Sequence, residues 1–86
     1  MKVKAYKRFQ RAYQNLPDEI QKKADRQITF LAKDLLHPSL HSKKIKGKEN
    51  IWEARVDLHH RMTFEIIEDT IYLRVVGNHD EVLKFP

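Results

Sequence analysis

The chain has 86 residues, which is enough for one small domain with a single hydrophobic core and too few for two. Its 41% hydrophobic and 34% charged residues are typical of a globular protein with a heavily solvated surface, and the lack of cysteine excludes disulfides and thiolate metal sites. No apolar run approaches the ~20 residues of a membrane span and the first ten residues lack a signal peptide's apolar segment, so we expect one cytoplasmic domain over residues 1–86.

The net charge of +5 is distributed unevenly along the chain. Residues 1–50 contain 13 Lys and Arg against 5 Asp and Glu, whereas residues 51–86 contain 4 against 7. A polyanion such as a nucleic acid is a natural partner for the basic part, because each contacted phosphate releases condensed counterions. The alternative is that lysine-rich helix faces only keep a small protein in solution.

The first part of the chain predicts a short strand followed by two helices. Residues 1–6 alternate apolar residues with lysines, as in a strand at a sheet edge where lysines discourage further pairing. Residues 9–16 place apolar side chains at the helical spacing i, i+3, i+4 and i+7. Pro17 interrupts that helix and opens a second one, with a buried stripe over residues 20–35. We expect the second helix to end at His37-Pro38, because proline disfavours helical geometry in the residue before it.

The second part of the chain predicts a sheet. Residues 38–50 contain four lysines, and we interpret them as a connection with outward-facing basic side chains. Alternation over residues 52–58, 62–66 and 71–77 then predicts an antiparallel meander whose last strand stops at Gly77. Residues 82–85 are expected to form a short fourth element or an ordered tail. The predicted fold class is α+β in two layers: a short N-terminal strand, a two-helix hairpin and a three- to four-stranded antiparallel sheet.

The polar residues left after this assignment are mainly cationic donors and histidines. The histidines show no metal-binding spacing, no serine lies in a glycine-flanked elbow, and the two glycines form no phosphate-binding loop, so we predict no metal and no cofactor. Cationic donors with a titratable histidine are the groups that metal-free phosphodiester chemistry uses. The set comprises Lys43, Lys44, Lys46, Arg55, His59, His60, Arg61, Arg74, His79, Asp80 and Glu81.

Four stretches occur in an informative order: KIKG at residues 44–47, WEARV at 52–56, HHRMTFEI at 59–66 and LRVVGNHDEV at 73–82. Together with the order of elements they resemble the RelE/ParE toxin superfamily of bacterial toxin–antitoxin modules, over nearly the whole chain. The resemblance implies a cognate antitoxin as partner. For the ribonuclease members it implies cleavage of messenger RNA on the ribosome without metal. ParE-like members act on DNA gyrase instead and lack an RNA-cleaving site, so fold alone does not decide between them.

The resemblance also implies roles for individual residues in RNA cleavage. Arg61 matches the family's phosphate-binding arginine, whose planar fork suits phosphate oxygens. His79 matches the branch of the family that uses histidine for acid–base chemistry at this position. The second proton carrier is left open between His59 and His60, with His60 the one assigned to the site and a turn or surface role as the alternative for both. Phe85 lies where the family often has an aromatic residue, so it can stack on a base but offers no acid–base group.

Six residues are predicted to bind RNA. For the lysines the alternative is a solvated loop, for the two arginines it is pairing with Glu53 or Glu65 across the sheet, and Trp52 is expected in the core. His79-Asp80 has the alternative of a turn in which Asp80 caps backbone amides. The alternatives to an endoribonuclease toxin are a ParE-like gyrase inhibitor and a non-catalytic toxin-fold protein that binds an antitoxin. The six residues are Lys43, Lys44, Lys46, Arg55, Arg74 and Phe85.

Overall fold

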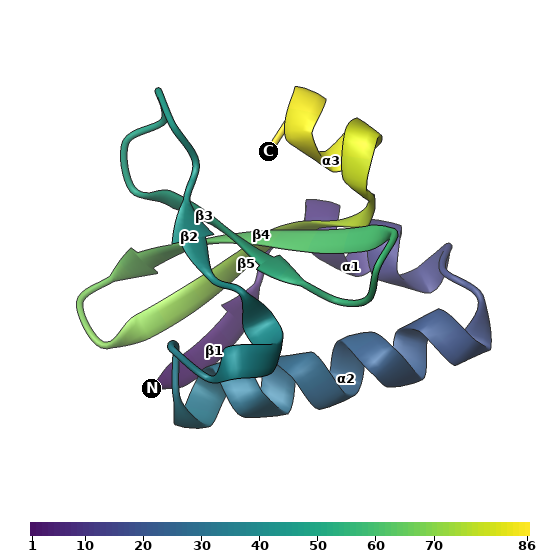
Figure 1. The fold of residues 1–86 in the computed structure, drawn as a ribbon, viewed down its shortest axis with the longest axis horizontal. Coiled ribbons are helices and arrows are strands. Elements are labelled where there is room, and N and C mark those ends of the chain that lie inside the picture. The colour runs from purple at the N-terminus through teal and green to yellow at the C-terminus, as the bar shows by residue number, and fades with distance from the viewer.

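The structure is a computed structural model that describes residues 1–86, and its centre is a five-stranded sheet (Figure 1). The sheet order is β1-β5-β4-β3-β2, with β1 parallel to β5 and every other neighbouring pair antiparallel. The predicted α+β class, the N-terminal edge strand and the antiparallel meander are confirmed. The strands are β1 (Lys2–Ala5), β2 (Lys43–Lys44), β3 (Ile51–Arg55), β4 (His60–Ile67) and β5 (Thr70–Asn78).

The two predicted helices cover one face of the sheet. They are α1 (Lys7–Gln14) and α2 (Asp18–Lys33), which begins directly after Pro17 and carries two acidic residues in its first turn, where the helix dipole favours negative charge. A short 3-10 helix, η1 (Pro38–Leu40), leads into β2. A third helix, α3 (His79–Lys84), lies on the opposite side of the sheet from α2 (Figure 1). The α3 helix makes the arrangement three layers deep at that end, where two layers were predicted.

The hydrophobic core lies between α1, α2 and the sheet face that meets them. Trp52 packs against this core and stacks on Phe64 with ring centroids 6.1 Å apart, which confirms its predicted core position. No helix of the fold is both long and apolar enough to cross a membrane. The core residues are Phe9, Ala24, Leu31, Leu40, Ala54, Val56, Met62, Phe64, Ile71, Leu73 and Val76.

Two predicted boundaries in the middle of the chain are wrong. The second helix ends at Lys33, before His37, because Asp34 adopts an extended backbone (φ −155°, ψ 103°) and its carboxylate accepts a hydrogen bond from the N–H of Leu36. Leu35 packs against the core although it lies beyond the helix, so the apolar spacing of the sequence predicted a longer helix than the one observed. The segment predicted as a plain connection contains β2, a two-residue strand that pairs with β3.

The end of the chain also differs from the prediction. The last strand does not stop at Gly77, which pairs with Arg61 inside the β4–β5 ladder, and it continues to Asn78. The Oδ1 atom of Asn78 accepts a hydrogen bond from the N–H of Asp80 and thereby caps α3. Residues 82–85 therefore follow helical geometry up to Lys84 instead of forming a strand or a tail.

The chain after α3 is tied to the sheet by hydrogen bonds. The Thr63 hydroxyl and the Nε atom of Arg74 donate to the main-chain oxygen of Pro86 at 2.8 Å and 3.0 Å, and Arg8 of α1 donates to that of Phe85. The α3 helix, with His79 as its first residue, is consequently held in a fixed place over the sheet.

Candidate active site

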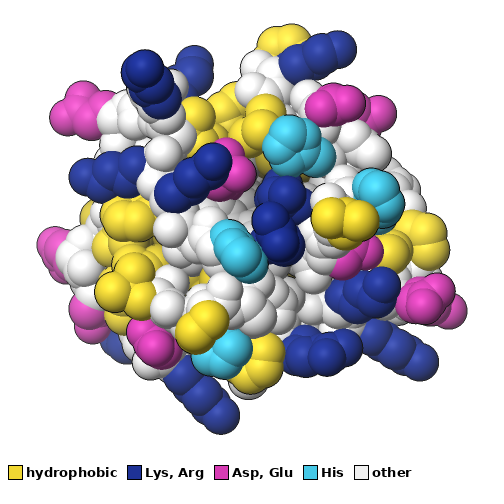
Figure 2. All heavy atoms as spheres, in the orientation of Figure 1, with side chains coloured by type: hydrophobic (Ala, Val, Ile, Leu, Met, Phe, Trp, Pro, Cys, Tyr) yellow, Lys and Arg dark blue, Asp and Glu magenta, His cyan; other side chains and the backbone are white.

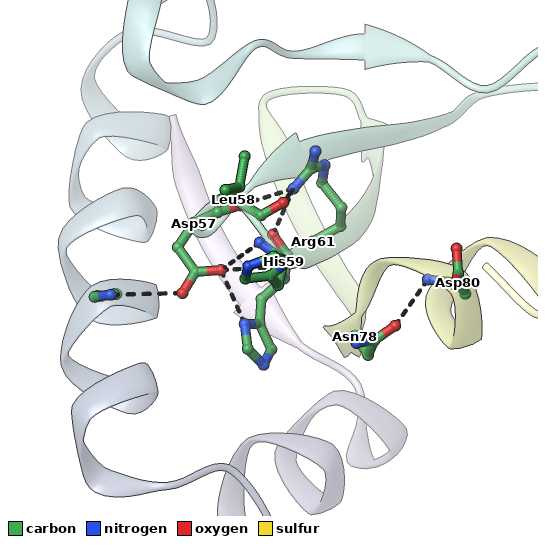
Figure 3. A network of polar contacts seen from close by, with 8 residues as sticks. Asp57, Leu58, His59, Arg61, Asn78 and Asp80 are labelled. Carbon is green, nitrogen blue, oxygen red and sulfur yellow. Dashed lines mark hydrogen bonds and ion pairs between the residues drawn. The ribbon is translucent and has the colours of Figure 1, made fainter.

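The turn between β3 and β4 is organised by the carboxylate of Asp57 (Figure 3). Its Oδ1 atom accepts hydrogen bonds from the N–H groups of His59 and His60 at 2.9 Å and 2.8 Å and contacts His60 Nδ1 at 2.9 Å. Its Oδ2 atom lies 3.6 Å from Lys23 Nζ on α2. Burial alone would raise the pKa of this carboxyl, but the hydrogen bonds from the His60 ring and from both N–H groups lower the pKa to about 2. Asp57 therefore stays ionised and fastens the turn to α2.

The guanidinium of Arg61, on β4, folds back onto this turn (Figure 3). Its Nη1 atom donates to the main-chain oxygens of Asp57 at 2.7 Å, Leu58 at 3.4 Å and His60 at 3.0 Å. The nearest carboxylate oxygen to its Nε atom, that of Glu53, is 4.0 Å away. The turn thus fixes one end of the guanidinium, while Nη2 makes no hydrogen bond within the chain.

Arg55 and Arg61 face each other directly across β3 and β4. Like charges opposite each other in a sheet are destabilising. Burial and the charge of Arg55 lower the pKa of Arg61, and the carboxylates of Glu53 and Asp57 only partly oppose this. Arg55 takes part in no ion pair, and its Nε atom is buried without a hydrogen-bond partner. Such a pair of cations is stabilised by a bound anion.

A polar cavity of about 390 Å³ contains this arginine pair. A neighbouring hollow of about 290 Å³, between the β3–β4 turn and the start of α3, shares Arg61 and His79 with it. Figure 2 shows Lys and Arg side chains in the middle of this face with histidines around them. The residues that line the larger cavity are His41, Ser42, Lys43, Glu53, Arg55, Arg61 and His79.

His79 reaches the cavity from the first position of α3. Its N–H donates to the main-chain oxygen of His59 at 2.9 Å, which ties the start of α3 to the β3–β4 turn. Its Nδ1 atom lies 3.2 Å from Asp80 Oδ1, so Asp80 orients the ring. The helix cap comes from Asn78 and not from Asp80. The Nε2 atom makes no hydrogen bond within the chain, and 43% of the side chain is exposed, so the ring is available to a ligand.

Four residues singled out from the sequence therefore meet in one cavity: Lys43, Arg55, Arg61 and His79. Their closeness follows from the sheet register. Arg55 lies opposite Arg61 in the β3–β4 ladder. Glu53 is on the same face of β3 as Arg55, and it lies opposite Lys43 of β2.

Two other predicted RNA-binding lysines lie outside this cavity, as does the aromatic residue. Lys44 points to the other face of β2, where its Nζ atom lies 5.5 Å from the centroid of the Trp52 ring. Lys46 is exposed in the β2–β3 loop, which rises from the sheet on the same side as α3 (Figure 1). Phe85 is 73% exposed and lines a separate groove between α1 and α3.

His60 and Arg74 are engaged in contacts within the protein. The ring of His60 is bonded to Asp57 and does not line either hollow beside His79. Arg74 Nη1 lies 3.3 Å from Glu65 Oε1, as the cross-strand alternative anticipated, and its Nε atom donates to the main-chain oxygen of Pro86. Neither side chain reaches the cavity that contains His79.

Sequence reasoning did not identify three residues that line the cavity: His41, Ser42 and Glu53. Glu53 was detectable in principle, because it precedes Arg55 by two positions and so shares its face of the strand. His41 has a left-handed backbone (φ 48°), and no sequence pattern signals that turn. No group of three or more His, Asp and Glu side chains in the structure is arranged to hold a metal ion.

Comparison of the sequence with models of known families and with curated proteins found no match. Comparison of the structure found the RelB–RelE antitoxin–toxin complex from Methanococcus jannaschii, with a TM-score of 0.79 and 28% identity over 98% of this chain and 100% of that chain. This is a RelE-like toxin fold. The resemblance that the sequence predicts is thereby confirmed.

The RelE-like fold is shared with toxins of other names. A YoeB/ParE toxin from Agrobacterium tumefaciens has a TM-score of 0.78 at 15% identity, covering 92% of this chain and 99% of that one. The YafQ protein of Escherichia coli has a TM-score of 0.78 at 9% identity, covering 93% and 94%. At these identities the likeness concerns the fold, so the chemistry has to be argued from the residues of the cavity.

Proposed function

We propose that this chain is the toxin of a toxin–antitoxin module and that it is an endoribonuclease that cleaves messenger RNA. The RelE-like fold supports the toxin assignment, since structures described as toxins share it, and the M. jannaschii toxin was solved with its antitoxin. The observation that supports ribonuclease chemistry is the meeting of Arg55, Arg61 and His79 in one polar cavity. A cognate antitoxin is accordingly the proposed protein partner.

The cavity suits cleavage by the neighbouring 2′-hydroxyl of the RNA itself. The 2′-oxygen attacks phosphorus while a side-chain base takes its proton, and the bond from phosphorus to the 5′-oxygen breaks while a side-chain acid protonates that oxygen. The products are a 2′,3′-cyclic phosphate and a 5′-hydroxyl. The charge that builds on the phosphorane faces Arg55 and Arg61, and the guanidinium of Arg61 is already held in place by the turn before substrate binds.

The two proton transfers fall to His79 and Glu53 in this proposal. His79 has a free Nε2 atom at the cavity, and an imidazole ring can both accept and donate a proton. Glu53 is the carboxylate that lines the cavity, on the β3 strand beside the arginine pair. Glu53 replaces His60, the candidate from the sequence, because the ring of His60 is hydrogen-bonded to Asp57. Cationic side chains supply the charge that a metal ion supplies in other nucleases, so the proposed reaction is metal-independent.

The RNA path follows from the exposed lysines around the cavity. Lys43 lines it directly, and the β2–β3 loop with Lys46 flanks the same side of the sheet as α3 (Figure 1). Lysines placed in this way hold the phosphate backbone and carry no base specificity. We propose the translating ribosome as the place where the message is cut.

Translating ribosomes incubated with the purified protein would test the proposal. Mapping the ends of the message should show site-specific cuts with a cyclic phosphate end. Metal independence is tested separately, without ribosomes: naked RNA at high concentration should still be cut when a metal chelator is present. The cuts should be lost in His79→Ala and kept in Lys84→Ala, a matched change of an exposed residue on the same helix. Unchanged cleavage by His79→Ala would reject the catalytic assignment.

A gyrase supercoiling assay on the same preparations separates the alternatives. Inhibition of supercoiling without RNA cleavage would favour the ParE-like function. Binding of an antitoxin with neither activity would favour the non-catalytic alternative.

A further inference from the structure

A second basic hollow lies between α2 and the end of β3, outside the cavity that contains His79. It has a volume of about 290 Å³ and is lined by three cationic residues, two neutral polar residues and one aliphatic residue. Arg55 lines both this hollow and the cavity, so the two adjoin at one residue. The lining residues are Lys23, Arg26, Gln27, Ser39, Arg55 and Val56.

The walls of this hollow are fixed by a buried glutamine. Gln27 of α2 is 7% exposed, and its Nε2 atom donates to the main-chain oxygens of Ser39 at 3.1 Å and Arg55 at 2.9 Å. One side chain thus joins three separate elements, α2, η1 and β3. The hollow is therefore part of the packed structure and not a gap between mobile loops.

The charge of this hollow is largely uncompensated. Arg26 and Arg55 take part in no ion pair, and only Lys23 has a carboxylate nearby, that of Asp57 at 3.6 Å. The Nε atom of Arg55 is buried without a hydrogen-bond partner, so the protein itself does not compensate this cation. A ligand with several anionic oxygens would balance the charge of the hollow.

We propose that this hollow is a second phosphate subsite, which binds the RNA backbone on the α2 side of the phosphate held at Arg61, with Arg55 bridging the two phosphates. The subsite rests on the proposed ribonuclease function for its ligand. RNA fits better than an acidic protein segment, because protein partners usually anchor through aromatic or aliphatic side chains and this lining offers only Val56. Figure 2 shows further cationic side chains along the α2 side of the same face.

The test measures binding of a single-stranded RNA oligonucleotide as a function of salt, in a His79→Ala background that prevents cleavage. Arg26→Ala removes one cation of the subsite, and Lys22→Ala removes an exposed cation of the same helix that does not line it. Loss of one phosphate contact should lower the slope of log K against log salt by about 0.7 and weaken binding several-fold at moderate salt. We expect the smaller slope and the weaker binding for Arg26→Ala and not for Lys22→Ala. The difference between the two variants should vanish when the ligand is a dinucleotide.

Equal slopes and equal affinities for Arg26→Ala and Lys22→Ala would overturn the subsite while leaving His79-dependent cleavage intact. Failure of the parent protein to bind RNA at all would overturn the proposed function and the subsite together. An acidic peptide that binds as tightly as RNA and depends equally on Arg26 would overturn the assignment to nucleic acid. Arg26 is exposed, so thermal unfolding of the variant should match that of Lys22→Ala, which excludes a folding defect as the cause.

Discussion

The three arginines of the sheet differ in how their charges are paired. Arg74 forms an ion pair with Glu65 at 3.3 Å and donates a hydrogen bond to the main-chain oxygen of Pro86 at 3.0 Å. Arg55 and Arg61 lie side by side with the nearest carboxylate oxygen 4.0 Å from Arg61. An arginine that is paired within the fold stabilises the protein. Two neighbouring arginines without partners destabilise it, and only a bound ligand offsets this loss. The difference separates an arginine that is paired within the fold from two that are left available to a ligand within a single sheet.

The largest expected effect is on catalysis at Arg61. Arg61→Ala should lower single-turnover RNA cleavage by ~10²–10³-fold, the usual consequence of removing one fixed donor to a developing negative charge. Arg61→Lys should also be impaired, because lysine keeps the charge but lacks the planar fork that the turn carbonyls hold in place. Cleavage rates on a defined message measure both. A variant with near-normal cleavage would remove Arg61 from the mechanism.

The next effect is on stability, through Asp57. Asp57→Asn should lower the free energy of unfolding at neutral pH by about 1–2 kcal/mol. The reason is that the carboxyl pKa is about 2 in the folded protein and 3.8 in the unfolded chain, where these contacts are absent. The unfolded state takes up the proton first as the pH falls, so the wild-type protein should lose this stability between pH 4 and pH 2. The variant should show a smaller loss over that window. Urea unfolding at several pH values would reveal parallel curves if Asp57 contributes nothing.

Arg74→Ala should give the reverse of the Arg61 result. It removes the contact with Glu65 and one of the two hydrogen bonds to the Pro86 oxygen, so stability should fall by about 1 kcal/mol. RNA cleavage at a temperature where the variant is folded should stay within about twofold of wild type, since Arg74 does not line the cavity. A cleavage defect as large as that of Arg61→Ala would erase the contrast between the two positions.

The smallest effect on stability is expected at Arg55. Arg55→Ala relieves the repulsion from Arg61, so its stability without ligand should lie within about 0.5 kcal/mol of wild type. Inorganic phosphate should raise the melting temperature of the wild-type protein more than that of Arg55→Ala, because an anion bound only by the folded state stabilises it. Equal shifts in the two proteins would show that the arginine pair is not an anion site.

Much of the fold was predictable because its periodic segments agree with their final environment. Helix α1 and strand β3 follow the apolar spacing of the sequence. The errors occurred where local chemistry overrides that spacing. Asp34 ends α2 although Leu35 continues the apolar stripe, and Asn78 caps a helix in a segment that reads as the end of a strand.

The site was only partly predictable, because it depends on strand register. The sequence identifies Arg61 and His79 as candidates, but it does not reveal that Arg55 lies opposite Arg61 or that Glu53 faces the same cavity. It also does not show that Asp57 engages the ring of His60, since that contact depends on the geometry of the turn. Residue types therefore indicate the chemistry, and the pairing of strands determines which residues share it.

The parallel pairing of β1 with β5 has a consequence for how the protein is made. Lys2 to Ala5 lie beside Thr70 to Leu73, so β1 acquires its partner only after the intervening residues and β5 have been translated. Contacts between such distant segments form late and slow the folding of small proteins. The polar cavity needs β3, β4 and the start of α3 as well. Under the proposed ribonuclease function, a nascent chain would thus stay inactive until α3 has been translated.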